Sequence, residues 1–289
     1  MNRKFKFYLP NIWESLLIVG IFLCIGSLFA SILLIAYSKL SGTSLTNMLN
    51  YNLLVIYIIP MVPVFCYIIL RSYLLAKQNG EYIKIHKPVK MEEGRKLSWL
   101  SISIVVLLSV LALGFAIDPI TAHIDIPEGL KPTYGKMSSG DIWSLLSVVI
   151  FAPLCEEFIF RGNIERGMLK KGSPAIAIIW SSFLFGFIHL NLFQGLAGFI
   201  MGAFIGYIYY KTHSIWLAIF AHFVNNGSSF LLVYLLPKEL ATMNTSQVLN
   251  YFNITNNIYW TIVALGALIC ILSIFTIEKS FPKNNHFRK

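Results

Sequence analysis

The sequence predicts an all-α, polytopic membrane protein with about eight transmembrane helices and with both termini in the cytoplasm. Of its 289 residues, 56% are hydrophobic and 12% are charged, and the mean hydropathy is +0.69. Soluble domains carry about 25% charged residues, so this composition excludes that class. A helix needs about 20 apolar residues to cross the hydrocarbon core of a bilayer. Eight apolar runs are expected to do so, at residues 13–37, 53–70, 97–117, 142–160, 175–190, 192–210, 215–236 and 258–277.

The distribution of lysine and arginine predicts the orientation of these helices. With eight spans, both ends of the chain lie on one side of the membrane, and the opposite side receives only four of the 23 basic residues, Lys39, Lys131, Lys136 and Lys238. Cytoplasmic loops carry the excess of basic residues, so we expect the termini in the cytoplasm. The net charge of +10 then reflects contacts with anionic lipid heads. We do not expect nucleic acid as a partner.

Polar residues divide the chain into regions. The first three spans and the last hold almost no ionisable group beyond Glu14, whereas the spans between them hold several. We therefore predict an N-terminal three-helix membrane region (1–137) and a catalytic helical core (138–236). An outer loop, the last helix and a basic cytoplasmic tail follow (237–289). Prolines and glycines in segment 118–141 favour an extended outer loop, and a glycine stripe in the sixth span favours close helix packing.

Two adjacent carboxylates, Glu156 and Glu157, end the apolar run of the fourth span. A charge at the centre of a bilayer costs about 2.5–3.5 kcal/mol on insertion scales, so such residues mark candidate sites. Residues four apart share a helix face, so Glu157 is expected to pair with Arg161 while Glu156 points elsewhere. This leaves Glu156 as the free carboxylate, suited to act as a general base. The alternative is a charge cluster that anchors the helix end at the inner headgroups.

Two further spans carry polar groups at helical spacing. His189 lies one turn after Phe185, and His222 lies one turn before Asn226. A single histidine of this kind is usually a packing residue, but polar faces on three apolar spans must find partners inside the protein. At 1.5 Å per residue, His189 falls nearer the outer half than Glu156 and His222. The fifth helix is therefore expected to begin below the membrane surface, to tilt, or to face a deep cavity.

A carboxylate, two imidazoles and an amide are the groups that peptide hydrolysis needs: a base for water, an orienting group or metal ligand, and donors for the oxyanion. The sequence has no HExxH motif, so it does not indicate a zincin. It also has no GxSxG motif around a serine nucleophile.

The ordered set EExxxR (Glu156 to Arg161), FxxxH (Phe185 to His189) and HxxxN (His222 to Asn226) resembles the motifs of the CPBP family. This family, also called Abi, comprises type 2 CAAX prenyl endopeptidases and bacterial relatives. The resemblance covers residues 142–236 and implies an intramembrane glutamic or metallo-endopeptidase with an eight-helix core. It implies that Glu156 and His189 activate water, that His222 and Asn226 bind the oxyanion, and that Glu157 and Arg161 brace the site. It leaves open a divalent metal such as zinc, held by Glu156, His189 and His222.

The resemblance also implies a substrate class. We expect a membrane-associated protein or peptide precursor, lipidated or not, in CAAX-type, pheromone or bacteriocin-related processing. The short tails and the absence of a recognisable organelle signal favour a bacterial plasma membrane. Two alternatives stay open: a non-catalytic scaffold or bacteriocin self-immunity protein, and a proton-coupled transporter.

Overall fold

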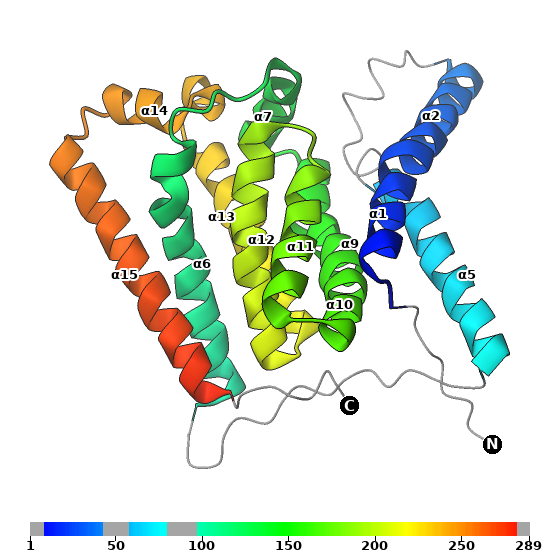
Figure 1. Cartoon of the computed structure of the whole chain (residues 1–289). Helices are drawn as coiled ribbons and strands as arrows, with labels where there is room; N and C mark the ends of the chain where they lie inside the picture. Colours follow the sequence, from blue (N-terminus) through cyan, green and yellow to red (C-terminus); the bar gives the residue numbers. More distant parts are fainter. Residues whose placement is uncertain (1–8, 43–57, 80–96, 282–289) are drawn as a thin grey trace.

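The computed structural model describes residues 9–42, 58–79 and 97–281, and these ranges consist of helices and turns, without a strand. Within them, six helices are long and apolar enough to cross a membrane, and two shorter apolar helices accompany them (Figure 1). The predicted all-α polytopic fold is thereby confirmed. The start of the second predicted span, residues 53–57, lies outside the described residues. The six long helices are Ile12–Ser41, Trp99–Thr121, Ile142–Lys170, Leu192–Thr212, Ile215–Leu235 and Asn256–Ser280, and the shorter two are Ile59–Leu75 and Pro174–Phe187.

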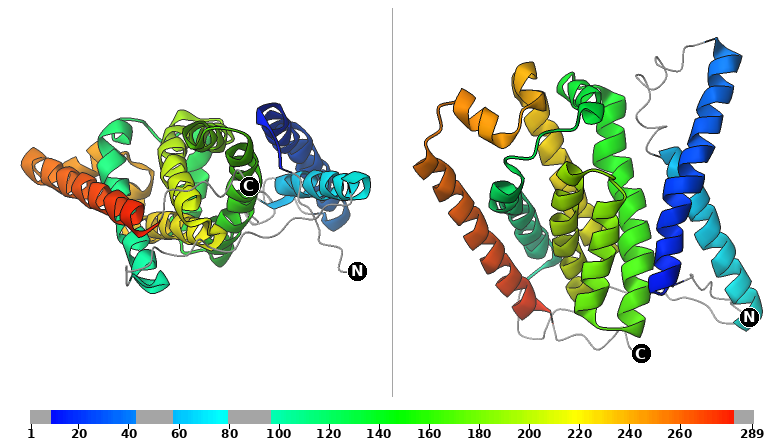
Figure 2. Two further views of the ribbon diagram at one scale, coloured as in Figure 1. Left: turned by 60° about the horizontal axis from the view of Figure 1, so that its bottom comes forward. Right: turned by 45° about the horizontal axis from the view of Figure 1, so that its top comes forward.

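The first two membrane helices along the chain, Ile12–Ser41 and the shorter Ile59–Leu75, form an antiparallel pair on one flank of the bundle, called the N-terminal pair below (Figure 2). Its first helix is continuous through α1, η1 and α2, and its second comprises the 3₁₀ turn η2 and α5. Asn11 caps α1 because its side chain accepts from the Glu14 N–H at 2.9 Å. A methyl group on Gly26 would collide with the Pro60 carbonyl, so glycine permits this crossing. The bounds are Ile12–Gly20 (α1), Ile21–Gly26 (η1), Ser27–Ser41 (α2), Ile59–Met61 (η2) and Val62–Asn79 (α5).

The centre of the bundle is a long irregular helix that carries both adjacent carboxylates. It was expected to end at residue 160, but it continues to Lys171, because Arg161 finds partners inside the protein and needs no exposure to lipid headgroups. Two π-helical segments interrupt it on either side of α9. Such segments are rare and often occur at functional sites. The elements are Ile142–Leu145 (α8), Leu146–Phe151 (η4), Ala152–Ile159 (α9), Phe160–Glu165 (η5) and Arg166–Lys171 (α10).

Three helices pack around this central helix. They are α11 (Pro174–Phe187), α12 (Leu192–Thr212) and α13 (Ile215–Leu235). The turn between α11 and α12 is tight, since Leu190 adopts a φ of 54°. Gly186 of α11 lies so close to the Gly195 carbonyl of α12 that a methyl group would not fit there. The predicted close packing along the glycine stripe is confirmed for this pair.

The opposite flank is formed by α6 (Trp99–Thr121) and α15 (Asn256–Ser280), and short helices cross the end of the bundle (Figure 1). Segment 118–141 was expected to be extended, which is wrong for part of it. The α6 helix continues through Pro119, and a helix, α7 (Lys131–Ser138), forms after the turn η3 (Glu128–Leu130). Pro132 does not prevent α7 because it lies in the first helical turn, where no N–H is needed. The segments η6 (Lys238–Thr242) and α14 (Thr245–Tyr251) lie at the same end.

One hydrophobic core joins the N-terminal pair to the motif-bearing helices. Ile18 and Val64 of the pair belong to the same buried cluster as Ile164, Ile205 and Ala218. A hydrogen bond adds to this packing: the Trp180 indole N–H on α11 donates to the Ser15 hydroxyl at 2.9 Å. The N-terminal pair is therefore packed directly against the helices that carry the candidate site.

Candidate active site

Both adjacent carboxylates are buried in α9. Glu156 is 6% exposed, and Glu157 is fully buried. Neighbouring side chains on a helix point in directions about 100° apart, so the two carboxylates meet different partners. The expected pair of Glu157 and Arg161 is present, with Arg161 Nη1 donating to Glu157 Oε1 at 2.9 Å.

Glu157 has a second partner that the sequence did not reveal. His222 Nδ1 lies 2.8 Å from the same oxygen, Glu157 Oε1. A carboxylate can only accept, so His222 presents an N–H at Nδ1, and its other ring nitrogen, Nε2, points toward Glu156 at 3.9 Å. Glu157 therefore fixes the orientation of the imidazole between the two carboxylates.

Arg161 is fully buried and connects Glu157 of α9 to the backbone of α12. Its Nη2 donates to the Gly202 carbonyl at 2.8 Å, its guanidinium lies 4.7 Å from the centre of the Phe185 ring, and Glu165 Oε2 is 3.9 Å from its Nε. The glycines of α12 make room for these charged groups. A methyl group on Gly206 would lie 2.6 Å from Glu165 Oε2. The glycine stripe thus accommodates the buried ions as well as bringing helix backbones close.

His189 reaches the site from the turn after α11. That helix has only 14 residues, which explains how a residue near its outer end meets residues from the middle of longer helices. The Phe185 ring packs edge-on against both imidazoles, with centroid distances of 5.8 Å to His189 and 5.4 Å to His222. No hydrogen bond or ion pair joins His189 to Glu156 within the described ranges.

Asn226 lies on the same face of α13 as His222, as the spacing predicted, but its amide is partly engaged. Its Nδ2 donates to the Val148 carbonyl of η4 at 2.8 Å, and its Oδ1 accepts from Asn225 Nδ2 at 2.9 Å. An amide nitrogen carries two hydrogens, so one of them remains for a ligand. The six predicted residues therefore converge, with Glu156, Glu157, Arg161 and His222 in direct contact and His189 and Asn226 at the rim.

Comparison with known proteins shows what the segment that carries this cluster is similar to. Residues 138–228 match the family model described as type II CAAX prenyl endopeptidase Rce1-like. We call this matched segment the Rce1-like core below. A protein of Bacillus subtilis (strain 168), named "Putative membrane peptidase YdiL", is 36% identical over 77 residues, which are 27% of this chain and 32% of that protein. The chain thus matches about a third of the length of that relative. No solved structure matches the chain.

The candidate metal ligands Glu156, His189 and His222 are not arranged as a metal site. In the ranges that the structure describes, no three His, Cys, Asp or Glu side chains are grouped so that they could hold a metal ion. Zinc lies about 2.0–2.2 Å from nitrogen and oxygen ligands, whereas Glu156 and His222 are 3.9 Å apart and His189 contacts neither directly. The three candidate ligands as arranged do not fit a metal, and we derive no step through one.

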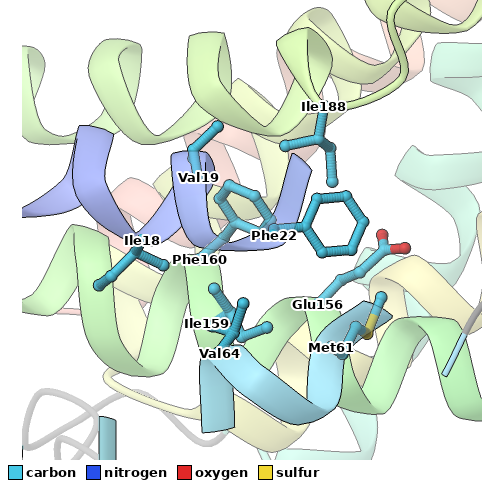
Figure 3. A pocket seen from close by; sticks show the side chains of 9 residues that line it. All are labelled: Ile18, Val19, Phe22, Met61, Val64, Glu156, Ile159, Phe160 and Ile188. Atoms are coloured by element: carbon cyan, nitrogen blue, oxygen red, sulfur yellow. The ribbon is translucent and has the colours of Figure 1, made fainter. Parts of the chain in front are cut away.

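A small cavity lies beside Glu156, between α9 and the N-terminal pair (Figure 3). Its volume of about 10 Å³ is close to the space that one water molecule needs, but the surface that lines it is apolar. Figure 3 shows the Glu156 carboxylate at the edge of this space, beside Phe22 and Met61. Among the described residues that line it, Glu156 is the only ionisable one. The contribution of Phe22 and Met61 was not foreseen, because the N-terminal spans carry no motif.

Proposed function

We propose that the chain is an intramembrane endopeptidase that hydrolyses a peptide bond in a membrane-associated protein or peptide precursor. One observation carries this proposal. The buried cluster of Glu156, His222, Glu157 and Arg161 lies within the segment that matches the Rce1-like family. Buried charges of this kind inside an apolar bundle are costly, and they are retained mainly where they serve a function.

In this proposal Glu156 is the general base. A water molecule bound by the Glu156 carboxylate gives a proton to Glu156 while its oxygen attacks the carbonyl carbon of the substrate, and the carbonyl oxygen becomes an oxyanion. His189, at the rim, orients the water. The proton on Glu156 then passes to the leaving amine as the carbon–nitrogen bond breaks, which returns the carboxylate to its starting state.

His222 and Asn226 stabilise the oxyanion in this scheme. In the protonated imidazole, Nδ1–H donates to Glu157 and Nε2–H points toward Glu156, where the oxyanion forms. The remaining N–H of the Asn226 amide is a second donor. Arg161 holds the Glu157 carboxylate in position, so Glu157 and Arg161 act through His222. Donors placed before the reaction typically contribute about 10²- to 10³-fold each to the rate.

The family description favours substrates of the CAAX type, and the printed name of the relative favours a membrane peptidase. We propose that the substrate is a C-terminally lipidated protein, or a pheromone or bacteriocin precursor, in a bacterial plasma membrane. These options predict different products. CAAX-type processing removes a short C-terminal peptide, whereas precursor processing cuts at an internal position.

The experiment compares cells that carry the wild-type chain with cells that carry Glu156→Gln at equal abundance. Membrane and secreted peptides are identified by mass spectrometry of their new termini. We expect cleavages that disappear in Glu156→Gln and persist in Glu14→Gln, a matched change in the N-terminal pair. The position of these cleavages identifies the substrate type. If both variants give the wild-type profile and both rescue a null strain, the chain acts instead as a scaffold or immunity protein.

A further inference from the structure

The cavity beside Glu156 has two unlike walls. One wall belongs to the Rce1-like core and contains Glu156 itself, Ile159, Phe160 and Ile188. The other comes from the N-terminal pair, which lies outside the segment matched by the family model. This second wall is entirely apolar. Its residues are Ile18, Val19, Phe22, Met61 and Val64.

The cavity is too small for a peptide. Hydrolysis brings the reacting atoms to within about 3–3.5 Å of each other, so the scissile carbonyl must reach a water molecule held by Glu156. The space between Glu156 and the N-terminal pair is only about 10 Å³, which admits no part of a peptide. A substrate that approaches from this side must therefore displace part of one wall.

Of the two walls, the substrate is expected to displace the side chains of the N-terminal pair. On the core side, Glu157, Arg161 and His222 are tied together by hydrogen bonds across α9, α12 and α13. On the other side, Phe22 lies in the π-helical segment η1 and Met61 in the 3₁₀ turn η2. Both are irregular helical segments, which often mark positions that move. Their contacts with the cavity are made by apolar side chains alone.

We propose that Phe22 and Met61 determine the sequence specificity of cleavage, by contacting the substrate side chain next to the scissile bond. This inference rests on the proposed endopeptidase function. The substrate side chain replaces the contacts that Phe22 and Met61 make in the closed cavity. It must therefore be apolar, because an unpaired charge or polar group in an apolar wall loses its hydration. Its permitted size is set by the space that the Phe22 ring leaves.

The test uses the full-length protein in liposomes with a peptide library prepared from bacterial membrane proteins. Cleavage sites are read by labelling of new N-termini and mass spectrometry. We expect the wild type to favour apolar residues at one position beside the cut. Phe22→Ala should increase cleavage before or after large residues such as Phe and Trp at that position by about 10-fold or more, since a pocket discriminates methylene-sized differences by about 10- to 200-fold.

Matched variants make the result specific. Phe29→Ala changes the same residue type in the same continuous helix, at a position that is 37% exposed and outside the cavity, so its profile should equal that of the wild type. Met61→Ala should shift preference at the same position as Phe22→Ala. If Phe22→Ala does not accumulate, Phe22→Leu gives the same comparison with a smaller cavity change.

The outcomes separate this inference from the proposed function. A wild type that cuts peptides, with identical profiles for Phe22→Ala, Met61→Ala and Phe29→Ala, overturns the specificity role and leaves the peptidase intact. A wild type that prefers charged residues at every position near the cut also overturns it. A wild type whose cleavage is no different from that of Glu156→Gln overturns both.

Discussion

The N-terminal pair and the Rce1-like core are both apolar on the outside but bury different groups. In the pair, the ion pair between Glu14 and Arg71 spans 3.7 Å, and both side chains are at least a quarter exposed. In the core, Glu157 and Arg161 approach to 2.9 Å with no exposure at all. The pair behaves as a packing and covering element, whereas the core concentrates buried charge around one imidazole.

The two regions also differ in their similarity to known proteins. The match to the Rce1-like family begins at residue 138 and does not include the N-terminal pair. That pair nevertheless supplies an entire wall of the cavity at Glu156. A match to the family model therefore describes the residues that carry the candidate chemistry and leaves this wall of the cavity undescribed.

The largest expected effect distinguishes the two ion pairs. Arg161→Met removes the arginine partner of the buried Glu157 carboxylate and leaves only His222 beside it, and breaking a buried ion pair in this way costs about 3–5 kcal/mol. Arg71→Met in the N-terminal pair should cost at most about 1 kcal/mol, because exposed ion pairs contribute little. Unfolding in detergent micelles, followed by circular dichroism against denaturant, measures both. Equal losses for the two variants would contradict the comparison.

The second prediction concerns the two carboxylates that flank Arg161. Glu157→Gln weakens the hold on His222, and loss of such an orienting partner typically lowers activity by about 10- to 100-fold. Glu165→Gln is the control, because Glu165 lies beside Arg161 and does not contact His222. We expect its activity to stay within a few-fold of the wild type. Steady-state peptide cleavage in liposomes provides the measurement; comparable losses in the two variants would contradict the orienting role of Glu157.

The third prediction compares two glycines. Gly206→Ala places a methyl group 2.6 Å from Glu165 Oε2 in the present geometry, and overpacking of this kind costs about 1–3 kcal/mol. Gly20→Ala in the N-terminal pair meets no atom within 4 Å and should stabilise the helix by up to about 1 kcal/mol. Thermal unfolding in detergent resolves these opposite signs. A Gly206→Ala protein as stable as the wild type would show that Glu165 adapts freely.

The smallest predicted effect lies at the joint between the two regions. Ser15→Ala removes the acceptor for the Trp180 indole N–H, and a hydrogen bond of this type contributes about 1 kcal/mol. Ser31→Ala, on the same continuous helix, removes only a hydroxyl bonded to the Ser27 carbonyl and should change stability by less than half of that. The same unfolding assay compares them, with tryptophan fluorescence as a second readout of Trp180. Indistinguishable stabilities would mean that apolar packing alone holds the pair to the core.

Much of the fold was predictable because it depends on local pattern. Apolar runs of suitable length identified the membrane helices, and helical spacing predicted the contact between Glu157 and Arg161, which the structure confirms. His189 was expected to reach the site, but the sequence alone did not explain how a residue near the outer half of the membrane meets Glu156 and His222. The short α11 and the turn at Leu190 account for it.

The remaining features depend on contacts between distant segments. His222 and Glu157 are 65 positions apart, and no periodicity within either helix indicates their hydrogen bond. The burial of Arg161 and Glu165 depends on glycines of another helix, α12. The cover over Glu156 comes from residues that read as ordinary lipid-facing apolar positions. Sequence patterns describe the faces of single helices, and they do not specify which faces meet.

The π-helical segments η1, η4 and η5 have a consequence for how this protein can be compared with its relatives. Each inserts about one residue more than an α-helix would need over the same turn. A regular helical wheel drawn through residues 142–171 therefore slips by about 100° at each insertion. Two homologous chains could then carry the same catalytic face with numbering that differs by one on either side of it. Alignments of this helix should admit single-residue gaps within it, and a deletion there would rotate the rest of the helix without changing any side chain.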